Sequence, residues 1–453
     1  MEQTTRKELA TEIFYAALKA VDPYNAVKLY TDKIRSVYQN GNFKRLIVTG
    51  FGKAACSMSK AMEDNLGDLI DTGILITKYG HSMSQESMIR IYEAGHPVPD
   101  ENGLRGTEEI VRLLKTINKS NPPSPPFSKG GMGGFLDENT LVVCLISGGG
   151  SALLVAPCEG ISLDEEQKIT QLLLKAGVDI YELNTVRKHI SKVKGGRLAE
   201  IAYPAKMISL VLSDVIGDRL DVIASGPTAP DKTTYNHAIG VLEKYKLTEK
   251  APESVINMLG NGAKGLIPET PKDDNPVFEK VENIIIGSNI KALEAAKTKA
   301  GSLGFKPEII SSEITGEARD VGKWLADIAR SKRSNSSNRL NCLISGGETT
   351  VTVKGNGMGG RNMELALAFA MEIECVEGIT LLSAGTDGTD GPTDAAGAIV
   401  DGQTVKKAKT TGLNPEEYLN NNDSYNFFKK IDELLVTGPT GTNVMDIQIM
   451  VIE

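Results

Sequence analysis

The sequence lacks the features that mark secreted, membrane or disulfide-bonded proteins. Its five cysteines are odd in number and mostly lie in apolar runs, so neither a disulfide framework nor a thiolate metal site is expected. No apolar run reaches the ~18 residues of a membrane span, and residues 1–32 mix acids and bases without a basic-then-apolar leader. These absences predict a cytoplasmic protein.

Basic charge, aromatic residues and histidine are also scarce. Lysine and arginine total 50 against 58 acidic residues, which gives a net charge of −8, and aromatic residues make up 5% of the chain. General nucleic-acid binding is therefore not expected, because it needs a basic surface that displaces counterions from phosphates. The four histidines are dispersed along the chain and give a zinc cluster little support. An anionic ligand must therefore be bound by a local group of residues and not by a generally basic surface.

The chain is long enough to need two domains. Its 453 residues exceed the ~250 to 300 that one hydrophobic core usually supports. A stretch rich in proline and charge at 264–280 places the expected boundary near residue 275, between domains 1–275 and 276–453. Residues 121–134 contain four prolines and four glycines, which predicts a disordered-looking surface insertion over about 120–137.

Short apolar runs alternate with helical patterns along the chain. Strand-like runs occur at 45–49, 73–77, 141–146 and 207–212, and helical spacing occurs at 106–117 and 162–176. Apolar strands that alternate with helices form parallel sheets covered on both faces. The sequence therefore predicts the α/β class with a parallel sheet.

The turn Gly50-Phe51-Gly52-Lys53-Ala54-Ala55 follows a strand and opens a helix, as a dinucleotide-binding turn does. The acid that would bind a ribose is missing, because the next strand ends in Thr77-Lys78-Tyr79-Gly80. A Walker P-loop is excluded, since Ala54 stands where serine or threonine should follow Gly-Lys. The macrodipole disfavours a lysine at a helix start unless an anion compensates. Lys53 is thus a candidate phosphoryl ligand, with Gly50 and Gly52 beside it; a surface lysine at a tight turn is the alternative.

A six-residue sequence, Cys-Leu-Ile-Ser-Gly-Gly, occurs at 144–149 and again 198 positions later at 342–347. Each copy ends a strand-like run in a turn whose glycines let backbone N–H groups approach a ligand. Phosphate or carboxylate binding is the functional interpretation, and a flexible strand-to-helix turn is the alternative. The candidate residues of the two turns are Ser147, Gly148, Gly149, Gly150, Ser151, Gly346, Gly347 and Glu348.

Carboxylates follow the strand-like run 207–212 and the apolar run 380–383. Asp214 comes directly after one of them, and Asp218 follows four residues later. At the carboxyl end of a strand they suit Mg²⁺, which takes one or two protein oxygens. Asp387 and Asp390 lie in a glycine-rich segment, 385–397, that lacks the spacing of an EF-hand loop. Nucleotide hydroxyls or Mg²⁺ are candidate ligands of Asp387, and ordinary turn chemistry is the alternative.

Four further polar side chains stand in unusual local settings. Arg361 and Asn362 begin a helix directly after a glycine-rich loop, and Arg361 there resembles a phosphoryl-stabilising arginine more than a surface charge. Arg187 opens the most basic stretch of the chain, 187–197, which is either a solvated helix face or a wall that holds a substrate carboxylate or nucleotide phosphates. His96 lies in a rigid loop flanked by prolines.

In combination, six segments of this sequence resemble the glycerate 2-kinase family, whose C-terminal part is called the MOFRL domain. Together they are highly specific, and they lie at 48–55, 95–100, 145–151, 213–218, 345–349 and 385–392. The resemblance implies a larger, Rossmann-like three-layer N-terminal domain, a smaller α/β C-terminal domain and an active cleft between them. The main departure from the family pattern is the insertion around 121–134, which lies between motifs.

The resemblance also implies a reaction. It is the transfer of the γ-phosphoryl group of ATP to the 2-hydroxyl of D-glycerate, giving 2-phosphoglycerate and ADP, with Mg²⁺ or another divalent cation. The catalytic lysine and arginine map to Lys53 and Arg361; we assign Asp214 to Mg²⁺ or the substrate hydroxyl, and His96 and Arg187 to the substrate. Family members have often been labelled hydroxypyruvate reductases, so an NAD(P)H-dependent reductase is the alternative, and a non-catalytic phosphometabolite sensor is a third. The oligomeric state, a homo-oligomer included, stays open.

Overall fold

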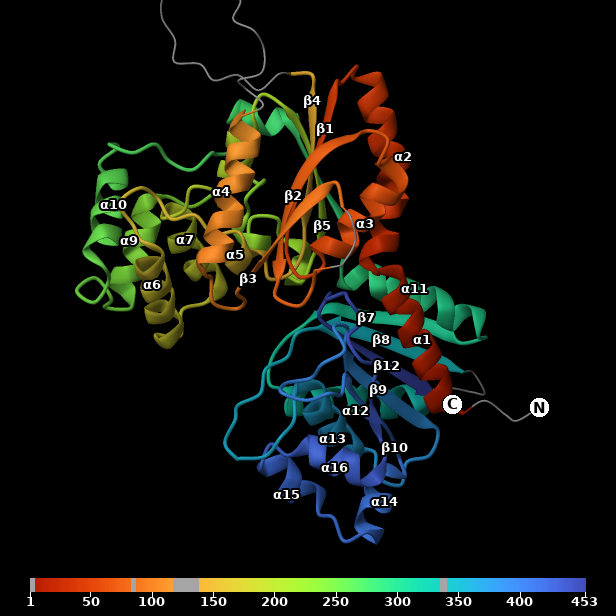
Figure 1. Cartoon of the computed structure of the whole chain (residues 1–453). Helices are drawn as coiled ribbons and strands as arrows, with labels where there is room; N and C mark the ends of the chain where they lie inside the picture. Colours follow the sequence, from red (N-terminus) through yellow and green to blue (C-terminus); the bar gives the residue numbers. More distant parts are fainter. Residues whose placement is uncertain (1–4, 83–86, 117–137, 335–339) are drawn as a thin grey trace, which may run out of the picture. The chain divides into compact units, whose positions relative to one another are not determined.

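The computed structural model describes residues 5–82, 87–116, 138–334 and 340–453 (Figure 1). The chain divides into two compact units. The N-terminal unit holds 26–212 and 218–286, and the C-terminal unit holds 1–25, 213–217 and 287–453. The expected insertion over 120–137 lies outside the described residues. Within the described ranges, no helix is long and apolar enough to cross a membrane.

The N-terminal unit is built on a six-stranded sheet. Its strands are β1 (Arg45–Phe51), β2 (Ile70–Lys78), β3 (Ile89–Ala94), β4 (Thr140–Ile146), β5 (Lys206–Leu212) and β6 (Val281–Gly287). Their order is β3-β2-β1-β4-β5-β6, and the pairs from β3 to β5 are parallel. This is the strand order of the Rossmann fold, in which the order reverses between β1 and β4. Central β4 is buried along its whole length, which explains its continuous run of apolar residues.

Helices cover both faces of this sheet and also form a separate cluster. They are α2 (Pro23–Asn40), α3 (Ala55–Leu66), α4 (Glu101–Thr116), α5 (Gly150–Leu153), α6 (Leu163–Lys175), α7 (Ile180–His189), α8 (Arg197–Ala202), α9 (Tyr235–Lys244) and α10 (Glu253–Ala263). α3 packs on β1, β2 and β4, whereas α4 packs on β2 and β3 from the other side (Figure 1). α6, α7, α9 and α10 enclose a core of their own, which includes Ile169, Val186 and Leu259. The predicted α/β class is confirmed.

The C-terminal unit has a mixed sheet. Its strands are β7 (Lys306–Ile314), β8 (Asn341–Gly347), β9 (Ile379–Gly385), β10 (Gly397–Asp401), β11 (Leu434–Leu435) and β12 (Asp446–Ile452). Their order is β11-β10-β9-β12-β8-β7; β7 and β8 are parallel, and β12 is antiparallel to both β8 and β9. The carboxyl ends of β7, β8 and β9 therefore meet the amino end of β12 at one edge of the sheet. Polar groups gathered at that edge come from segments far apart in the sequence.

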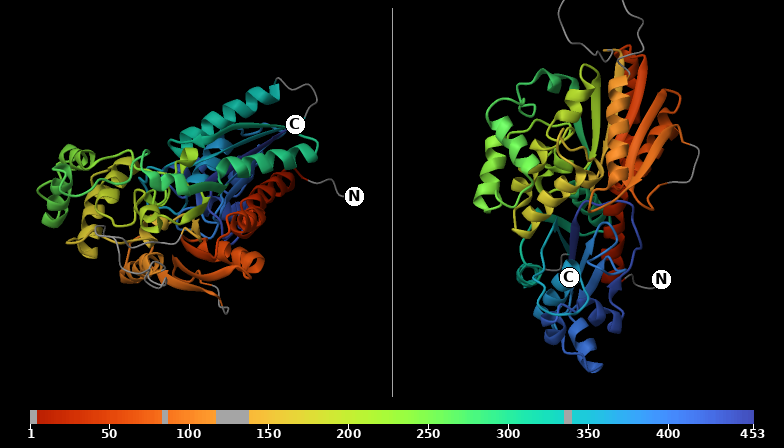
Figure 2. Two further views of the ribbon diagram at one scale, coloured as in Figure 1. Left: turned by 90° about the horizontal axis from the view of Figure 1, so that it is seen from above. Right: turned by 60° about the vertical axis from the view of Figure 1, so that its left-hand side comes forward.

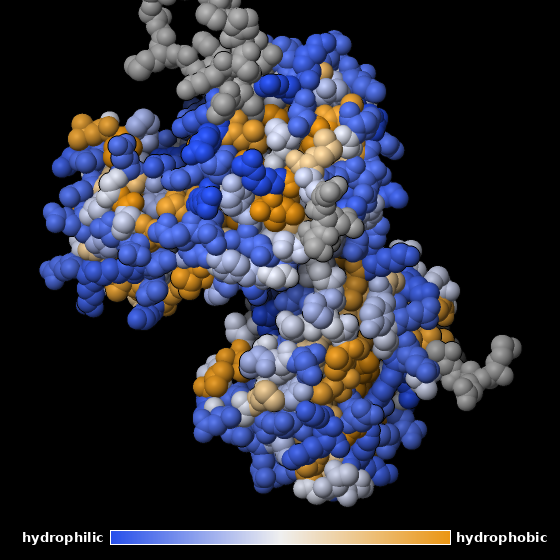
Figure 3. Space-filling view, in the orientation of Figure 1, coloured by the Kyte–Doolittle hydropathy of each residue, from blue (hydrophilic) through white to orange (hydrophobic). Residues whose placement is uncertain are grey.

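Helices lie on both faces of the mixed sheet too. They are α1 (Arg6–Ala20), α11 (Asn289–Ser302), α12 (Ala318–Ser334), α13 (Arg361–Glu372), α14 (Thr404–Thr410), α15 (Pro415–Asn420) and α16 (Ser424–Ile431). α1 packs beside α11 and against β9 and β12 (Figures 1 and 2). α12 and α13 pack together and share a core with Leu343, Met450 and Ile452. The face drawn in Figure 3 is mostly hydrophilic, with hydrophobic residues in separate patches, as expected when most apolar side chains are inside.

The compact units differ in three places from the split expected at residue 275, and the shortest of these is the segment 213–217, which belongs to the C-terminal unit. Strand β6 ends at Gly287 and completes the N-terminal sheet, so that sheet extends past the proline-rich stretch at 264–280. Helix α1 opens the chain, yet it belongs to the C-terminal unit because Ala10, Ile13 and Phe14 are buried within that unit. An amphipathic pattern shows that a helix has an apolar face, but it does not show which sheet covers that face.

We predict that the C-terminal unit depends on α1 for stability. Phe14 is completely buried, so Phe14→Ala should lower the free energy of unfolding by about 3 to 5 kcal/mol. The neighbouring Tyr15 is 47% exposed, and Tyr15→Ala should cost less than about 1 kcal/mol. Denaturant titration of both variants measures the difference. Equal small losses would show that α1 does not dock on the sheet.

Candidate functional site

The turns that follow β1 and β4 are bonded to each other at the point where the strand order reverses. The backbone N–H of Lys53 donates to the carbonyl of Gly148 at 2.9 Å, and the N–H of Ala54 donates to Ser147 Oγ at 3.1 Å. A Cβ atom at Gly52, whose φ is +129°, would lie 2.1 Å from Ser147 Oγ, so only glycine allows this approach. Open α/β sheets bind ligands at such a point. The structure thus brings together two turns that the sequence identified separately.

Basic side chains gather around Gly149 in the second of these turns. A Cβ atom at Gly149 would lie 2.9 Å from His96 Cδ2 and 3.4 Å from Lys53 Cγ. His81 also reaches this region, because its Nδ1 lies 3.3 Å from the carbonyl oxygen of Lys53. Lys53 follows β1 and His96 follows β3, yet both side chains lie next to Gly149. This arrangement can hold an anion between a lysine, an imidazole and backbone N–H groups.

The charge of this region shows in the pKa of His96. Burial lowers that pKa to about 4, and the positive charges of Lys53, Lys78 and His81 add to the effect. His96 is therefore neutral near pH 7, and its ring can donate or accept a hydrogen bond without adding positive charge. An anion bound beside Lys53 would offset the repulsion and raise this pKa.

Ser151 is held by helix α7 through a chain of hydrogen bonds. Its Oγ lies 3.0 Å from Ser225 Oγ, which donates to Asn184 Oδ1 at 2.9 Å. Ser225 itself has a φ of +63°, in the left-handed region that non-glycine residues rarely adopt. A strained backbone packed against a glycine-rich turn is typical of functional sites, where surrounding structure enforces the strain.

The structure places Arg187 in a buried charged cluster with Glu166 and Lys194. Burial lowers the pKa of Arg187, while the nearby Glu166 raises it. Burial also lowers the pKa of Lys194 to about 8, and Lys194 Nζ donates to the carbonyl of Leu154 at 2.6 Å. The solvated helix face that was one interpretation of 187–197 is therefore wrong, because most of this stretch is buried. A role for Arg187 at the substrate stays a prediction.

Asp214 and Asp218 fall on opposite sides of the division between the two units. Asp214 is half-buried directly after β5, next to Ser213, whose backbone N–H donates to the carbonyl of Gly287 at 2.9 Å. Asp218 ends a short 3-10 turn with a φ of +52°. Within the described part of the chain, no group of three or more metal-ligating side chains occurs. A metal role for either carboxylate stays a prediction.

In the C-terminal unit, Arg361 is clamped by two carboxylates. Its Nε and Nη2 donate to the two carboxylate oxygens of Asp446 at 2.6 and 3.0 Å, and its Nη1 lies 2.7 Å from Glu348 Oε1. Asp446 is 1% exposed, so the bidentate pair is largely shielded from water. These hydrogen bonds outweigh the effect of burial and raise the pKa of Arg361, which keeps it protonated. Asp446 thus fixes the side of the guanidinium that carries Nε and Nη2. The pair lies where the carboxyl ends of β8 and β9 meet the amino end of β12.

Asp390 caps the helix that Arg361 begins. Its carboxylate accepts the backbone N–H groups of Asn362 at 3.1 Å and Met363 at 2.8 Å. Burial raises the pKa of Asp390 to about 7, and these N–H bonds oppose the rise. The Asn362 amide is engaged as well, because its Oδ1 accepts from Ser383 Oγ at 2.8 Å. Asn362 is buried, and in this structure it ties α13 to β9.

The remaining candidates of this unit have structural contacts. A Cβ atom at Gly346 would lie 2.1 Å from Asn289 Oδ1, and one at Gly347 would lie 2.2 Å from the carbonyl of Ile314. Asp387 Oδ1 accepts the backbone N–H of Thr389 at 3.0 Å, as in an ordinary Asx turn. These glycines are needed for backbone packing, whatever else they bind.

Sequence reasoning missed Asp446. It lies 85 residues after Arg361, and the two meet only because β12 runs antiparallel between β8 and β9. The one local signal is an acid at the start of a strand-like run, whereas the acid that the sequence singled out, Asp214, follows one.

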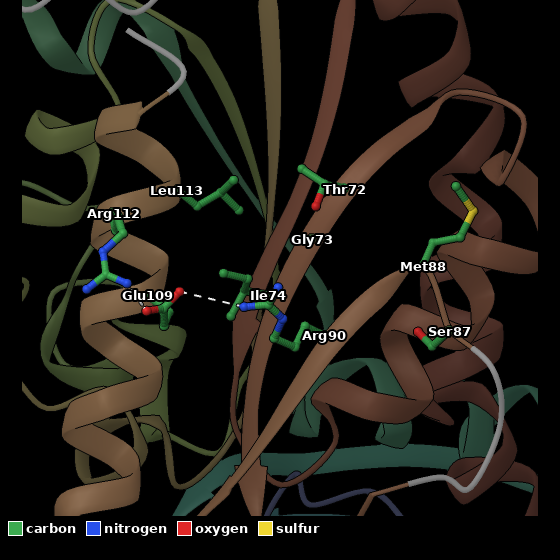
Figure 4. Close-up of a pocket in the computed structure, with 9 residues that line it drawn as sticks. All are labelled: Thr72, Gly73, Ile74, Ser87, Met88, Arg90, Glu109, Arg112 and Leu113. Carbon is green, nitrogen blue, oxygen red and sulfur yellow. Dashed lines mark hydrogen bonds and ion pairs between the residues drawn. The ribbon is translucent and has the colours of Figure 1, made fainter. Parts of the chain in front are cut away.

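A hollow in the N-terminal unit lies away from these groups. It is lined by Thr72, Gly73, Ile74, Ser87, Met88, Arg90, Glu109, Arg112 and Leu113 (Figure 4). Arg90 Nη1 lies 3.7 Å from Glu109 Oε2, so part of its charge is neutralised. None of the predicted site residues lines this hollow, and its strand residues come from the middle of β2 and the start of β3.

Comparison with known proteins gives matches over nearly the whole chain. Residues 9–260 match the family described as "Domain of unknown function (DUF4147)", and residues 341–446 match the MOFRL family. A D-glycerate 2-kinase of Thermotoga maritima is 48% identical over 97% of each chain. The crystal structure of a glycerate kinase from the same organism matches with a TM-score of 0.86 at 47% identity, over 99% of each chain. A protein of Agrobacterium vitis named "Putative hydroxypyruvate reductase" is 38% identical, over 90% of this chain and 99% of that one.

We predict a pH dependence of stability that reports on His96. Its folded pKa of about 4 lies below the ordinary 6.5, so between these values the unfolded chain binds more protons than the folded one. The stability that His96 contributes is complete above about pH 6.5 and is lost as the pH falls through about 4. His96→Gln should therefore flatten the stability profile in this window. An NMR titration that gives the His96 imidazole a pKa of 6.5 or more would contradict this.

Proposed function

The chain belongs to the glycerate 2-kinase family, and we propose that it transfers the γ-phosphoryl group of ATP to the 2-hydroxyl of D-glycerate, giving 2-phosphoglycerate and ADP. One observation carries the proposal: each unit presents a cation at the start of a helix, beside one copy of the Ser-Gly-Gly sequence. Lys53 precedes α3 and bonds to the turn after β4, whereas Arg361 begins α13 and pairs with Glu348, which directly follows the Ser-Gly-Gly residues at the end of β8. Cations so placed suit the charge that spreads over a migrating phosphoryl group.

The proposed roles follow from what each side chain contacts. Phosphoryl transfer needs positioning and charge neutralisation more than covalent chemistry, and Lys53 and Arg361 supply both. Backbone N–H groups of the turn at 147–151 hold phosphate or carboxylate oxygens. His96, neutral and next to Lys53, orients the substrate by a hydrogen bond. The Glu348 carboxylate pairs with Arg361 Nη1 before substrate binds, and a phosphoryl oxygen of the substrate then takes the place of this carboxylate.

Asp214 is the proposed protein ligand of Mg²⁺. The carboxylate is half-buried directly after β5, at the edge where open sheets bind ligands. Mg²⁺ usually binds one or two carboxylates together with water and substrate phosphates, so a single carboxylate fits this ion. The ion would supply charge neutralisation at the nucleotide phosphates. The roles of Asp218 and Asp387 are proposed only as supports of this region.

A nicotinamide-dependent reductase has less support. A ribose-binding acid is expected at the end of the second strand of such a fold. Here β2 ends at Lys78, and the following Tyr79 donates its hydroxyl to Asp100 at 2.6 Å. The reductase name of one relative therefore finds no matching feature at this position.

A coupled assay tests the proposed reaction. Purified protein with D-glycerate, ATP and Mg²⁺ should give ADP and 2-phosphoglycerate, identified by NMR or mass spectrometry against 3-phosphoglycerate. Hydroxypyruvate with NADH or NADPH is assayed in parallel. Reductase turnover in the absence of kinase turnover would overturn the proposal.

Lys53→Ala and Arg361→Ala should each lower kcat by about 10² to 10³, the usual cost of a lost transition-state contact. The double variant should lose less than the product of the two factors, because groups that stabilise one transition state act as a unit. Lys60→Ala on α3 and Arg330→Ala on α12 remove surface cations of the same units and should leave kcat unchanged. Near-wild-type turnover in either single variant would remove that residue from catalysis.

Asp446→Asn should lower kcat by about 10²-fold with little change in KM for glycerate, because Arg361 would lose the bidentate clamp that orients it. Its matched control is Glu433→Gln, which removes a buried carboxylate paired with Lys7 in the same unit. Kinetics are measured well below the melting temperature of each variant. Equal kcat values for the two variants would show that Asp446 has only a structural role.

A further inference from the structure

A second hollow lies in the C-terminal unit, at the turn from β7 to α12. It has a volume of about 590 Å³, within the usual range for small-molecule sites. The lining residues are Ser311, Ile314, Thr315, Gly316, Glu317, Asp320, Val321 and Trp324. None of them belongs to the motifs that the sequence analysis selected. The hollow therefore calls for an explanation of its own.

Trp324 gives this hollow its chemical character. It is the single tryptophan of the chain, it lies on α12, and 45% of it is exposed. An exposed tryptophan beside a hollow offers a flat apolar face on which a planar ring can stack. Val321, one turn earlier on the same helix, and Ile314 at the end of β7 add apolar surface. This lining suits an aromatic ligand better than a small polar acid such as glycerate.

The hollow is connected to Arg361 through Ile314 and Glu348. Ile314 ends β7, and its carbonyl accepts the backbone N–H of Glu348 at 2.9 Å; the Glu348 carboxylate pairs with Arg361. In the sheet order, β7 is separated from β12, where Asp446 holds Arg361, by β8 alone. Two strand spacings amount to about 10 Å. A ribose and a chain of phosphates can bridge such a span.

The span from the hollow to Arg361 has charges of opposite sign at its two ends. Glu317 and Asp320, both acidic, line the hollow, whereas the guanidinium of Arg361 is the positive group at the far end of the span. Both oxygens of Glu317 already accept hydrogen bonds from Thr352, so Asp320 is the carboxylate suited to a ligand. A carboxylate accepts hydrogen bonds from ribose hydroxyls or from an exocyclic amine, and it repels phosphate. The sign of the charges would thus orient a nucleotide with its base in the hollow.

We propose that this hollow binds the purine base of the nucleotide substrate, with the ring stacked on Trp324 and Asp320 accepting a hydrogen bond from the nucleoside. The inference rests on the proposed function for its claim that the nucleotide is a phosphoryl donor. It goes further by assigning the base to the β7–α12 turn of the C-terminal unit.

The sole tryptophan makes binding directly measurable. Adenosine and ADP should quench Trp324 emission saturably, and tripolyphosphate and glycerate, which have no base, should leave it unchanged. In steady-state kinetics, Trp324→Ala should raise KM for ATP about tenfold, as expected for loss of one stacking contact, while KM for glycerate and kcat stay the same. Trp324→Phe should keep most of the affinity. Val436→Ala, which also truncates an exposed apolar side chain of this unit, should change neither KM.

The outcomes separate this inference from the proposed function. Kinase turnover with an unchanged KM for ATP in Trp324→Ala and no quenching by adenosine would overturn the base site and leave the kinase proposal standing. Quenching by adenosine without kinase turnover would support a nucleoside site and overturn the proposed reaction. Equal quenching by tripolyphosphate would overturn the base site as well, since the emission would then report phosphate binding. Thermal melting of each variant controls for folding.

Discussion

Strand direction is the constraint on which both units depend. Central strands are buried on both faces, and their backbone N–H and C=O groups are bonded within the sheet. Groups that contact a ligand can therefore lie only where the strands end. In the N-terminal unit, parallel pairing carries the ends of β1, β2, β3 and β4 to one edge. In the C-terminal unit, antiparallel β12 brings its first residue, Asp446, to the edge where β8 and β9 finish. Lys53 and Asp214 lie just beyond such ends, and Arg361, the first residue of α13, is bonded to Asp446 at one of them.

The repeated Ser-Gly-Gly sequence has different partners in its two copies. In the first copy, Ser147 bonds to the turn after β1, and Gly149 leaves room for His96 and Lys53. In the second copy, Gly346 makes room for Asn289 and Gly347 for the backbone of Ile314. Glycine is therefore required sterically in both copies; basic side chains pack directly against a glycine of the first, whereas Arg361 pairs with Glu348, the residue after the second. The same sequence therefore has different backbone structure in the two units, because the first Ser-Gly-Gly lies in the turn that leads into α5, whereas the second forms the last three residues of β8.

Sequence reasoning was accurate where local pattern decides structure. The four strand-like runs correspond to β1, β2, β4 and β5, and the two turns that follow β1 and β4 meet because parallel strands end together. It was inaccurate where distant packing decides. The pattern of α1 could not show that it docks beside α11, and that of the basic stretch 187–197 could not show that Arg187 and Lys194 would be buried. Asp446 escaped notice because its partner lies on another element and only the antiparallel register brings the two together.

The clamp on Arg361 also explains how an acidic protein can present a cation at a partly buried position. A charge without a partner in such a place would be strongly destabilising, so Arg361 needs an anion in the resting state. Asp446 is buried and bidentate, whereas Glu348 is 45% exposed and binds only Nη1. In the proposed reaction, exchange of Glu348 for a phosphoryl oxygen would replace one anion by another and leave Arg361 paired throughout. The more exposed carboxylate is thus the one that can leave at low cost, and the guanidinium keeps its orientation because the buried carboxylate remains bound.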